Sequence, residues 1–185
     1  MKKWFIGKMV KNKFWTPDRV VTLTAIFISL FTLLVFAKQT SIIEKQSHLS
    51  VMPYLYIETG YNPDKDFITL TLNNYGVGPA IIQEMKISYK GEIYEMDFAD
   101  FLQTDFFQND SIAVLASASI DTGLAIPANA ERIAVKFGGS GERYIKTEKF
   151  LRKLERNEFD YEIIYRSIYD DAWRIRKSDD IPEKL

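Results

Sequence analysis

The amino-acid sequence predicts a mainly β fold, in which an N-terminal transmembrane helix is followed by an antiparallel β-sandwich of about eight or nine strands with one or two short helices. Three observations support this prediction. An uncharged apolar run occupies Val20–Ala37. From Tyr54 onward, short runs of β-branched and aromatic residues alternate with turn signals, as in all-β sandwiches. The 185 residues, 46% of them apolar, suffice for one packed domain and an appendage.

The apolar run Val20–Ala37 has the length of a membrane-spanning helix. Its 18 residues would extend roughly 27 Å, close to the hydrocarbon thickness of a bilayer. Six basic residues precede it against Asp18 alone, so the positive-inside rule places the N-terminus in the cytoplasm. The alternative is a signal peptide cleaved after Ala37, because Val35 and Ala37 suit a signal peptidase site. The 19-residue segment before the run favours an uncleaved anchor.

The segment 1–19 alternates aromatic and basic residues, a pattern typical of a helix at the lipid headgroups. An ordinary aromatic and basic flank is the alternative. In both cases the segment anchors the chain and the lipid bilayer is its partner. The expected membrane-interface residues are Trp4, Phe5, Lys8, Lys11, Lys13, Phe14, Trp15 and Arg19.

The rest of the chain divides into a stalk (38–53), the sandwich (54–177) and a C-terminal tail (178–185). The predicted strands are YLYIE, FITLTLN, AIIQEMKISY, EIYEM, SIAVLASASI, RIAVKF, EIIYRSIY and AWRIR, with hairpin turns at Lys90-Gly91 and Asp170-Asp171. Helical spacing of apolar residues predicts short helices over Asp97–Phe107 and Thr147–Asn157, the second with Thr147 as its N-cap.

Two segments, LNNYGVGPAIIQEMKISYKG and YEIIYRSIYDDAWRIR, resemble parts of small bacterial membrane-anchored proteins whose exported part is an immunoglobulin-like sandwich. The resemblance covers about 35 of the 185 residues and carries no catalytic motif. It implies an Ig-like sandwich in a single-pass protein of the bacterial inner membrane, with the C-terminal domain periplasmic or extracellular.

Composition argues against several function classes. The net charge of −1 conceals +5 over residues 1–19 and −6 over the remainder, and a net-acidic domain is a poor binder of nucleic acid. The glycines in KFGGSGERYIKT do not match a nucleotide-binding loop.

The sequence also lacks the residues of common metal and catalytic sites. There is no Cys, and the only histidine is His48 in the stalk, which is expected to be a solvated linker residue. Asp64 and Asp66 fall short of a calcium loop, so we expect no cofactor or metal.

An acidic block, Glu92–Glu131, contains eight acidic residues and no Lys or Arg, and Arg132–Arg156 then carries eight basic and three acidic residues. Within the acidic block, DFADFLQTDFF interleaves phenylalanines with acids, which is consistent with a docking patch. The alternative is that the phenylalanines pack in the core and the two blocks neutralise each other. The candidate partner-binding residues are Asp97, Phe98, Asp100, Phe101, Asp105, Phe106 and Phe107.

The leading hypothesis from sequence is a non-enzymatic interaction or assembly module of a bacterial envelope complex, which binds another envelope protein or a second copy of itself. The second is a tethered ligand- or glycan-binding module, which an aromatic-lined groove between strands would favour. The third is a hydrolase with carboxylates that the sequence does not identify, which converging carboxylates in a deep cleft would favour.

Overall fold

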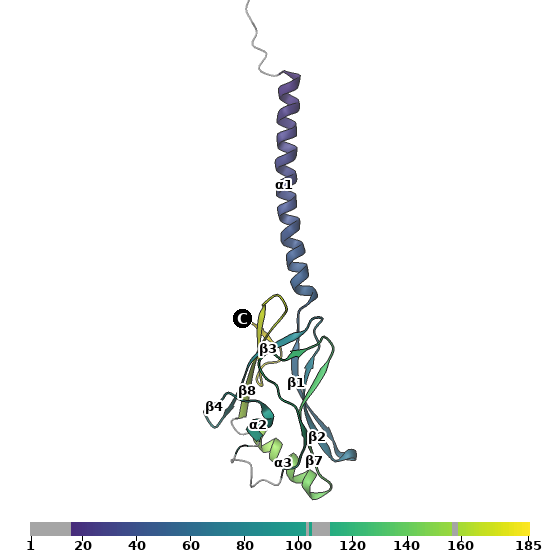
Figure 1. The fold of residues 1–185 in the computed structure, drawn as a ribbon, viewed down its shortest axis with the longest axis vertical. Helices are drawn as coiled ribbons and strands as arrows, with labels where there is room; N and C mark the ends of the chain where they lie inside the picture. Colours follow the sequence, from purple (N-terminus) through teal and green to yellow (C-terminus); the bar gives the residue numbers. More distant parts are fainter. Residues whose placement is uncertain (1–15, 103, 105–111, 157–158) are drawn as a thin grey trace, which may run out of the picture. The chain divides into compact units, whose positions relative to one another are not determined.

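The computed structural model describes residues 16–102, 104, 112–156 and 159–185 (Figure 1). The chain divides into two units, Met1–Gln46 and Ser47–Leu185, each of which is described by itself. The first unit holds most of helix α1 (Pro17–Ser50), and the second holds all of the described strands.

Helix α1 is long and apolar enough to cross a membrane, and none of its residues is buried. The hydroxyls of Thr22, Thr24 and Thr32 donate hydrogen bonds to carbonyl oxygens one turn earlier, at 2.8, 2.9 and 2.8 Å, so these polar groups are satisfied inside the apolar segment. The helix continues through residues 38–50 and ends three residues before Pro53. This end is expected, because a proline disfavours helical geometry in the residue that precedes it.

The second unit is a sandwich of two antiparallel sheets, so the predicted mainly β fold is confirmed (Figure 1). The first sheet has the order β1-β2-β7-β5, and the second has the order β10-β9-β8-β3-β4 with β6 paired to β3. The strands of the first sheet are β1 (Leu55–Asn62), β2 (Phe67–Asn74), β5 (Val114–Ser117) and β7 (Glu131–Gly138). Those of the second are β3 (Ala80–Tyr89), β4 (Glu92–Tyr94), β6 (Ala125–Ile126), β8 (Phe159–Arg166), β9 (Ala172–Arg176) and β10 (Glu183–Lys184).

Both predicted hairpins are present. Lys90 (φ 52°) and Gly91 (φ 82°) join β3 to β4, and two consecutive positive φ angles are those of the tight turn whose twist suits a hairpin. Asp170 (φ 63°) lies in the turn between β8 and β9. The described part has ten strands rather than eight or nine, because β6 and β10, two residues each, have too few residues to give a sequence signal.

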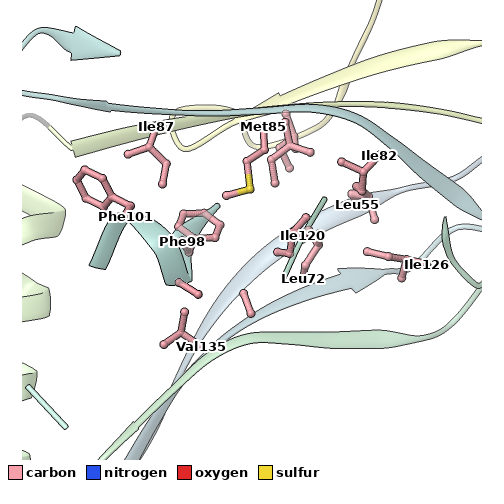
Figure 2. Close-up of a cluster of buried hydrophobic side chains, with 14 of the residues drawn as sticks. Leu55, Leu72, Ile82, Met85, Ile87, Phe98, Phe101, Ile120, Ile126 and Val135 are labelled. Atoms are coloured by element: carbon pink, nitrogen blue, oxygen red, sulfur yellow. The ribbon is translucent and has the colours of Figure 1, made fainter. Parts of the chain in front are cut away.

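The core lies between the sheets. Figure 2 shows Leu72 and Val135 of the first sheet facing Ile82, Met85 and Ile87 of the second. The sequence FITLTLN of β2 alternates in the way expected of a half-buried strand, because Ile68, Leu70 and Leu72, at every second position, lie in or against this core.

Short helices close one end of the sandwich (Figure 1). Helix α2 (Phe98–Leu102) begins after Asp97, whose carboxylate accepts a hydrogen bond from the N–H of Asp100 at 2.8 Å.

Helix α3 (Glu142–Arg156) begins five residues before the predicted N-cap Thr147, which is instead buried inside the helix, so that prediction was wrong. The turn at Gly139 (φ 139°) and Gly141 (φ 60°) lets the helix begin directly after β7. A further short helix, η1 (Pro63–Lys65), joins β1 to β2.

Candidate functional site

A cleft of about 500 Å³ opens within the second unit, between the edge strand of one sheet and the end of the other. We call it the β1 cleft. One side is formed by residues 56–59 of β1, and the other by Lys177, Asp179 and Asp180, which follow β9. The rest of its lining consists of Leu70, Phe98, Phe159, Tyr161 and Ile175.

Among the strands that the structure describes, β1 is at the edge of its sheet and pairs only with β2. Tyr75 donates its N–H to the carbonyl of Tyr54 at 2.8 Å, so Tyr54 and every second residue after it face β2 with their backbone groups. By this alternation, Ile57 and Thr59 direct their N–H and C=O groups away from β2, toward the cleft. No hydrogen bond from another described residue reaches these groups. The cleft therefore has one wall of unpaired backbone.

The unpaired edge of β1 begins after Leu55, whose outward N–H has a partner. The N–H of Leu55 donates to the phenol oxygen of Tyr165 at 3.3 Å, which joins the start of β1 to the second sheet. Tyr165 is fully buried and stacks on Trp173, and its burial raises the pKa of its phenol, which stays neutral. The start of β1 is thus tied to the second sheet at Leu55, and the residues that follow, 56–59, line the cleft.

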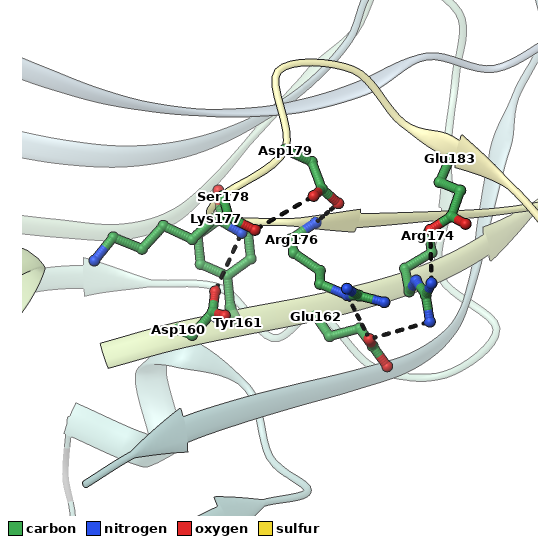
Figure 3. A network of polar contacts seen from close by, with 9 residues as sticks. All are labelled: Asp160, Tyr161, Glu162, Arg174, Arg176, Lys177, Ser178, Asp179 and Glu183. Atoms are coloured by element: carbon green, nitrogen blue, oxygen red, sulfur yellow. Dashed lines mark hydrogen bonds and ion pairs between the residues drawn. The ribbon is translucent and has the colours of Figure 1, made fainter. Parts of the chain in front are cut away.

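The opposite wall is held by a set of local hydrogen bonds (Figure 3). The carboxylate of Asp179 accepts a hydrogen bond from the N–H of Arg176 at 3.0 Å and from the hydroxyl of Ser178 at 3.3 Å. Asp160 accepts one from the N–H of Lys177 at 3.3 Å. These bonds fix the chain after β9, so the wall facing β1 is preorganised.

Aromatic rings line the cleft beneath these walls. Phe98 meets Tyr161 edge to face at 5.6 Å, and the ammonium of Lys177 donates to the carbonyl of Phe159 at 2.9 Å. Burial raises the pKa of the Tyr161 phenol, which therefore remains a neutral hydrogen-bond donor at physiological pH. The cleft combines apolar surface with a few fixed polar groups, as ligand-binding clefts generally do.

Outside the cleft, the outer face of the second sheet neutralises its own charges. Glu162 accepts a hydrogen bond from Arg176 at 3.0 Å and lies 3.7 Å from Arg174, which also pairs with Glu183 at 2.6 Å (Figure 3). Paired charges of this kind present a solvated face with little net field. We therefore locate the candidate site in the β1 cleft.

The structure places the candidate residues of the acidic block in different environments. Phe98 and Phe101 are only 2% and 0% exposed and pack in the core, so they are not docking anchors on the surface. The reason is that the helical spacing of apolar residues directs both rings onto the end of the sandwich. Asp97 is buried and caps α2, and Asp100 is exposed. Of the described candidates, only Phe98 lines the β1 cleft.

Other predicted residues lie outside the described part of the chain. These are Asp105, Phe106 and Phe107 of the acidic block and Trp4, Phe5, Lys8, Lys11, Lys13, Phe14 and Trp15 of the N-terminal segment. Arg19 is described and lies in the first turn of α1.

His48 is not the solvated linker residue expected from sequence. Its Nδ1 pairs with the carboxylate of Asp171, and its ring stacks on Tyr169 at 4.7 Å. All three residues belong to the second unit. No group of three metal-ligating side chains is found among the described residues.

Sequence reasoning missed the residues that form the cleft walls, namely Tyr56, Glu58, Lys177, Asp179 and Asp180. One signal was present, because LYIETGYN contains one charge and neither Pro nor Lys, the residues that commonly protect an edge strand. No protein-family model matches the chain, and no curated protein is significantly similar to it.

Proposed function

We propose that this protein is a membrane-anchored, non-enzymatic binding module that takes an extended segment of another protein into the β1 cleft. The segment adds to β1 as a further strand. The single observation that carries the proposal is the outward, unpaired backbone of Ile57 and Thr59 along one wall of a cleft.

Strand addition follows from the chemistry of this wall. An edge strand presents alternating N–H and C=O groups, and an extended peptide satisfies them with main-chain hydrogen bonds of its own. Side-chain pockets beside the edge then distinguish one peptide from another. The β1 cleft offers both features, since apolar and charged side chains surround the edge.

A single extended segment suits the cleft better than a second folded copy. The fixed chain after β9 faces β1 across the cleft and limits the space beside it. One strand requires about 5 Å in the hydrogen-bonding direction, whereas a second sandwich would bring its whole sheet. Self-association through β1 would give a concentration-dependent mass in analytical ultracentrifugation, and we expect none.

A second candidate is a ligand- or glycan-binding module, which the aromatic lining favours. Tyr56, Phe159 and Tyr161 offer ring faces and phenol groups of the kind that sugars contact. A glycan array probed with the full chain tests this candidate. Saturable glycan binding that is unaffected by changes to the edge of β1 would favour it over peptide binding.

For the cellular setting, the basic N-terminal segment supports a cytoplasmic N-terminus, and the resemblance to bacterial membrane-anchored proteins supports an inner-membrane location. The binding module would then lie in the periplasm or outside the cell. Helix α1 would keep it within reach of other envelope proteins.

Amide hydrogen exchange tests strand addition on the unchanged protein. The full chain in detergent micelles is first used to select binders from a displayed library of random peptides. On addition of a selected peptide, the amides of Ile57 and Thr59 should become protected, whereas those of Tyr56 and Glu58 are already protected by β2. Binding with no added protection at Ile57 and Thr59 would contradict strand addition.

A pair of proline variants provides the matched test. Thr59→Pro removes an N–H that points out of the sheet, where proline is tolerated. Ser117→Pro does the same on β5, the opposite edge of the same sheet, because Ala118 donates its N–H to Ala134 and Ser117 therefore faces outward. We expect Thr59→Pro to abolish peptide binding and Ser117→Pro to preserve it, with both variants folded by circular dichroism. Equal binding by folded Thr59→Pro and wild type would overturn the proposal.

A further inference from the structure

An apolar cavity of about 50 Å³ lies behind the β1 cleft. It shares Thr59, Leu70, Phe98 and Phe159 with the cleft, and it extends to Leu151 and Leu154 of α3. Apart from Thr59, every described residue that lines it is apolar, so these residues offer a water molecule few hydrogen-bond partners. An unfilled apolar space directly behind a free strand edge is a pocket for an entering side chain.

The size of the cavity limits which side chain it accepts. Its volume is several times the roughly 10–15 Å³ that one water molecule needs, so a branched aliphatic side chain such as leucine or isoleucine fits it, whereas alanine leaves most of it empty.

The geometry of a paired strand directs a side chain to this place. Thr59 lies on the same face of β1 as the buried Leu55, because alternate residues of a strand share a face. A residue paired beside Thr59 in an added strand would present its side chain on that inner face. The inner face at Thr59 leads to the cavity, since Thr59 lines it.

The charges around the cleft add a second requirement. Of the charged residues described in its lining, three are acidic (Glu58, Asp179 and Asp180) and one, Lys177, is basic. The carboxylate of Glu58 accepts a hydrogen bond from Asn73 at 3.1 Å, and Asp180 is exposed. An acidic rim favours a ligand segment with a basic residue and repels an acidic one.

We propose that the β1 cleft selects an extended segment that carries a Leu- or Ile-sized anchor for the cavity and a basic residue for the acidic rim. This inference rests on the proposed function, because it assumes that a peptide strand occupies the cleft. It specifies the chemistry of that peptide: main-chain pairing provides attachment, and the anchor and the charge provide specificity.

The test uses synthetic fluorescent peptides of about ten residues in a Ser/Thr background, each with one Leu and one Arg whose spacing is varied. Their binding to the full chain in detergent micelles is measured by fluorescence anisotropy. In the best spacing, Leu→Ala should weaken binding by roughly 10- to 100-fold, since about three buried carbons are lost. Arg→Glu should also weaken binding, by an amount that shrinks in 0.5 M salt because rim charges are screened.

Two protein variants, each with a control variant, locate these effects. Leu154→Phe adds three carbons to the cavity from α3 without touching the walls of the cleft, so the Leu and Ala peptides should bind alike. Leu124→Phe makes the same chemical change elsewhere against the core and should preserve the preference. Asp180→Lys leaves Glu58 and Asp179 against two lysines and should therefore remove the preference for Arg over Glu. Asp121→Lys changes an exposed acid outside the cleft and should preserve that preference.

The outcomes separate the two proposals. If Leu and Ala peptides bind wild type equally and Thr59→Pro abolishes both, strand addition holds and the anchor proposal fails. If no peptide in the set or in the displayed library binds wild type, both the proposed function and the anchor proposal fail. A preference for Leu that persists in folded Leu154→Phe would show that the cavity is not the anchor pocket.

Discussion

Gly78 lies directly against the backbone of Val51: a Cβ atom on Gly78 would be 2.0 Å from the carbonyl oxygen of Val51. Gly76 is similarly close to the chain, with Met52 O at 2.5 Å from its Cβ position. The carbonyl of Met52 also accepts a hydrogen bond from the N–H of Val77 at 3.0 Å. The segment NNYGVGP therefore encloses the chain where it enters β1, and its glycines are needed for close approach rather than for turn geometry.

The first prediction is that Gly78→Ala destabilises the folded unit. The added methyl meets backbone, which moves only at the expense of the start of β1, so we expect a loss of about 1–3 kcal/mol in the free energy of unfolding. Gly60→Ala is the control, because its nearest contact is the hydroxyl of Thr69, at 2.8 Å, on a movable side chain. Urea unfolding of the full chain in detergent measures both. An equal loss for both variants would contradict the role of the Val51 contact.

A comparison of β2 with the β1 cleft shows which features could be predicted from the sequence and which could not. Alternation in FITLTLN and the turn at Lys90-Gly91 are local signals, so the strands and hairpins followed from them. The cleft depends on which strand is an edge, and Thr59 and Asp179 are brought together only by the order of strands in two sheets. No local pattern encodes that order. The pairing of His48 with Asp171 was hidden for the same reason, as 123 residues separate them.

The second prediction concerns Phe101. Its ring is fully buried and lies 5.8 Å from Tyr89 and 5.8 Å from Phe159, so Phe101→Ala should cost about 3–5 kcal/mol by leaving a cavity. Phe101 was a partner-binding candidate from sequence, and its burial identifies it as a core residue instead. Phe107, a candidate outside the described residues, stays a predicted docking residue, so Phe107→Ala should weaken partner capture without lowering the melting temperature. Thermal unfolding of the two variants compares them directly, and a wild-type melting temperature for Phe101→Ala would contradict its place in the core.

The third prediction concerns pH. Lys184 donates to Asp171 at 2.8 Å and His48 pairs with it from the other side, and these bonds lower the pKa of the Asp171 carboxyl. A carboxyl whose pKa is lower in the folded than in the unfolded chain stabilises the fold in full above the unfolded pKa of about 3.9. That contribution is lost as the pH falls through the folded pKa.

Urea unfolding at a series of pH values from 6 to 3, followed by tryptophan fluorescence, checks this. Wild type should lose stability more steeply below about pH 4 than Asp171→Asn, which has no proton to bind there. Asp170→Asn is the control, because Asp170 is exposed and pairs with Arg166 on the surface. Parallel curves for wild type and Asp171→Asn would show that this carboxyl does not contribute.

The last prediction concerns the orientation of the chain in the membrane, for which the absence of cysteine is useful. A single introduced cysteine is the only thiol in the protein, so labelling reports one position. With a membrane-impermeant maleimide on spheroplasts, Ser178→Cys should be labelled at once, and Lys3→Cys only after the membrane is opened. Immediate labelling of Lys3→Cys would reverse the predicted topology. The mass of the protein labelled at Lys3→Cys also tests the anchor, because a chain cleaved after Ala37 would separate that label from the β1 cleft.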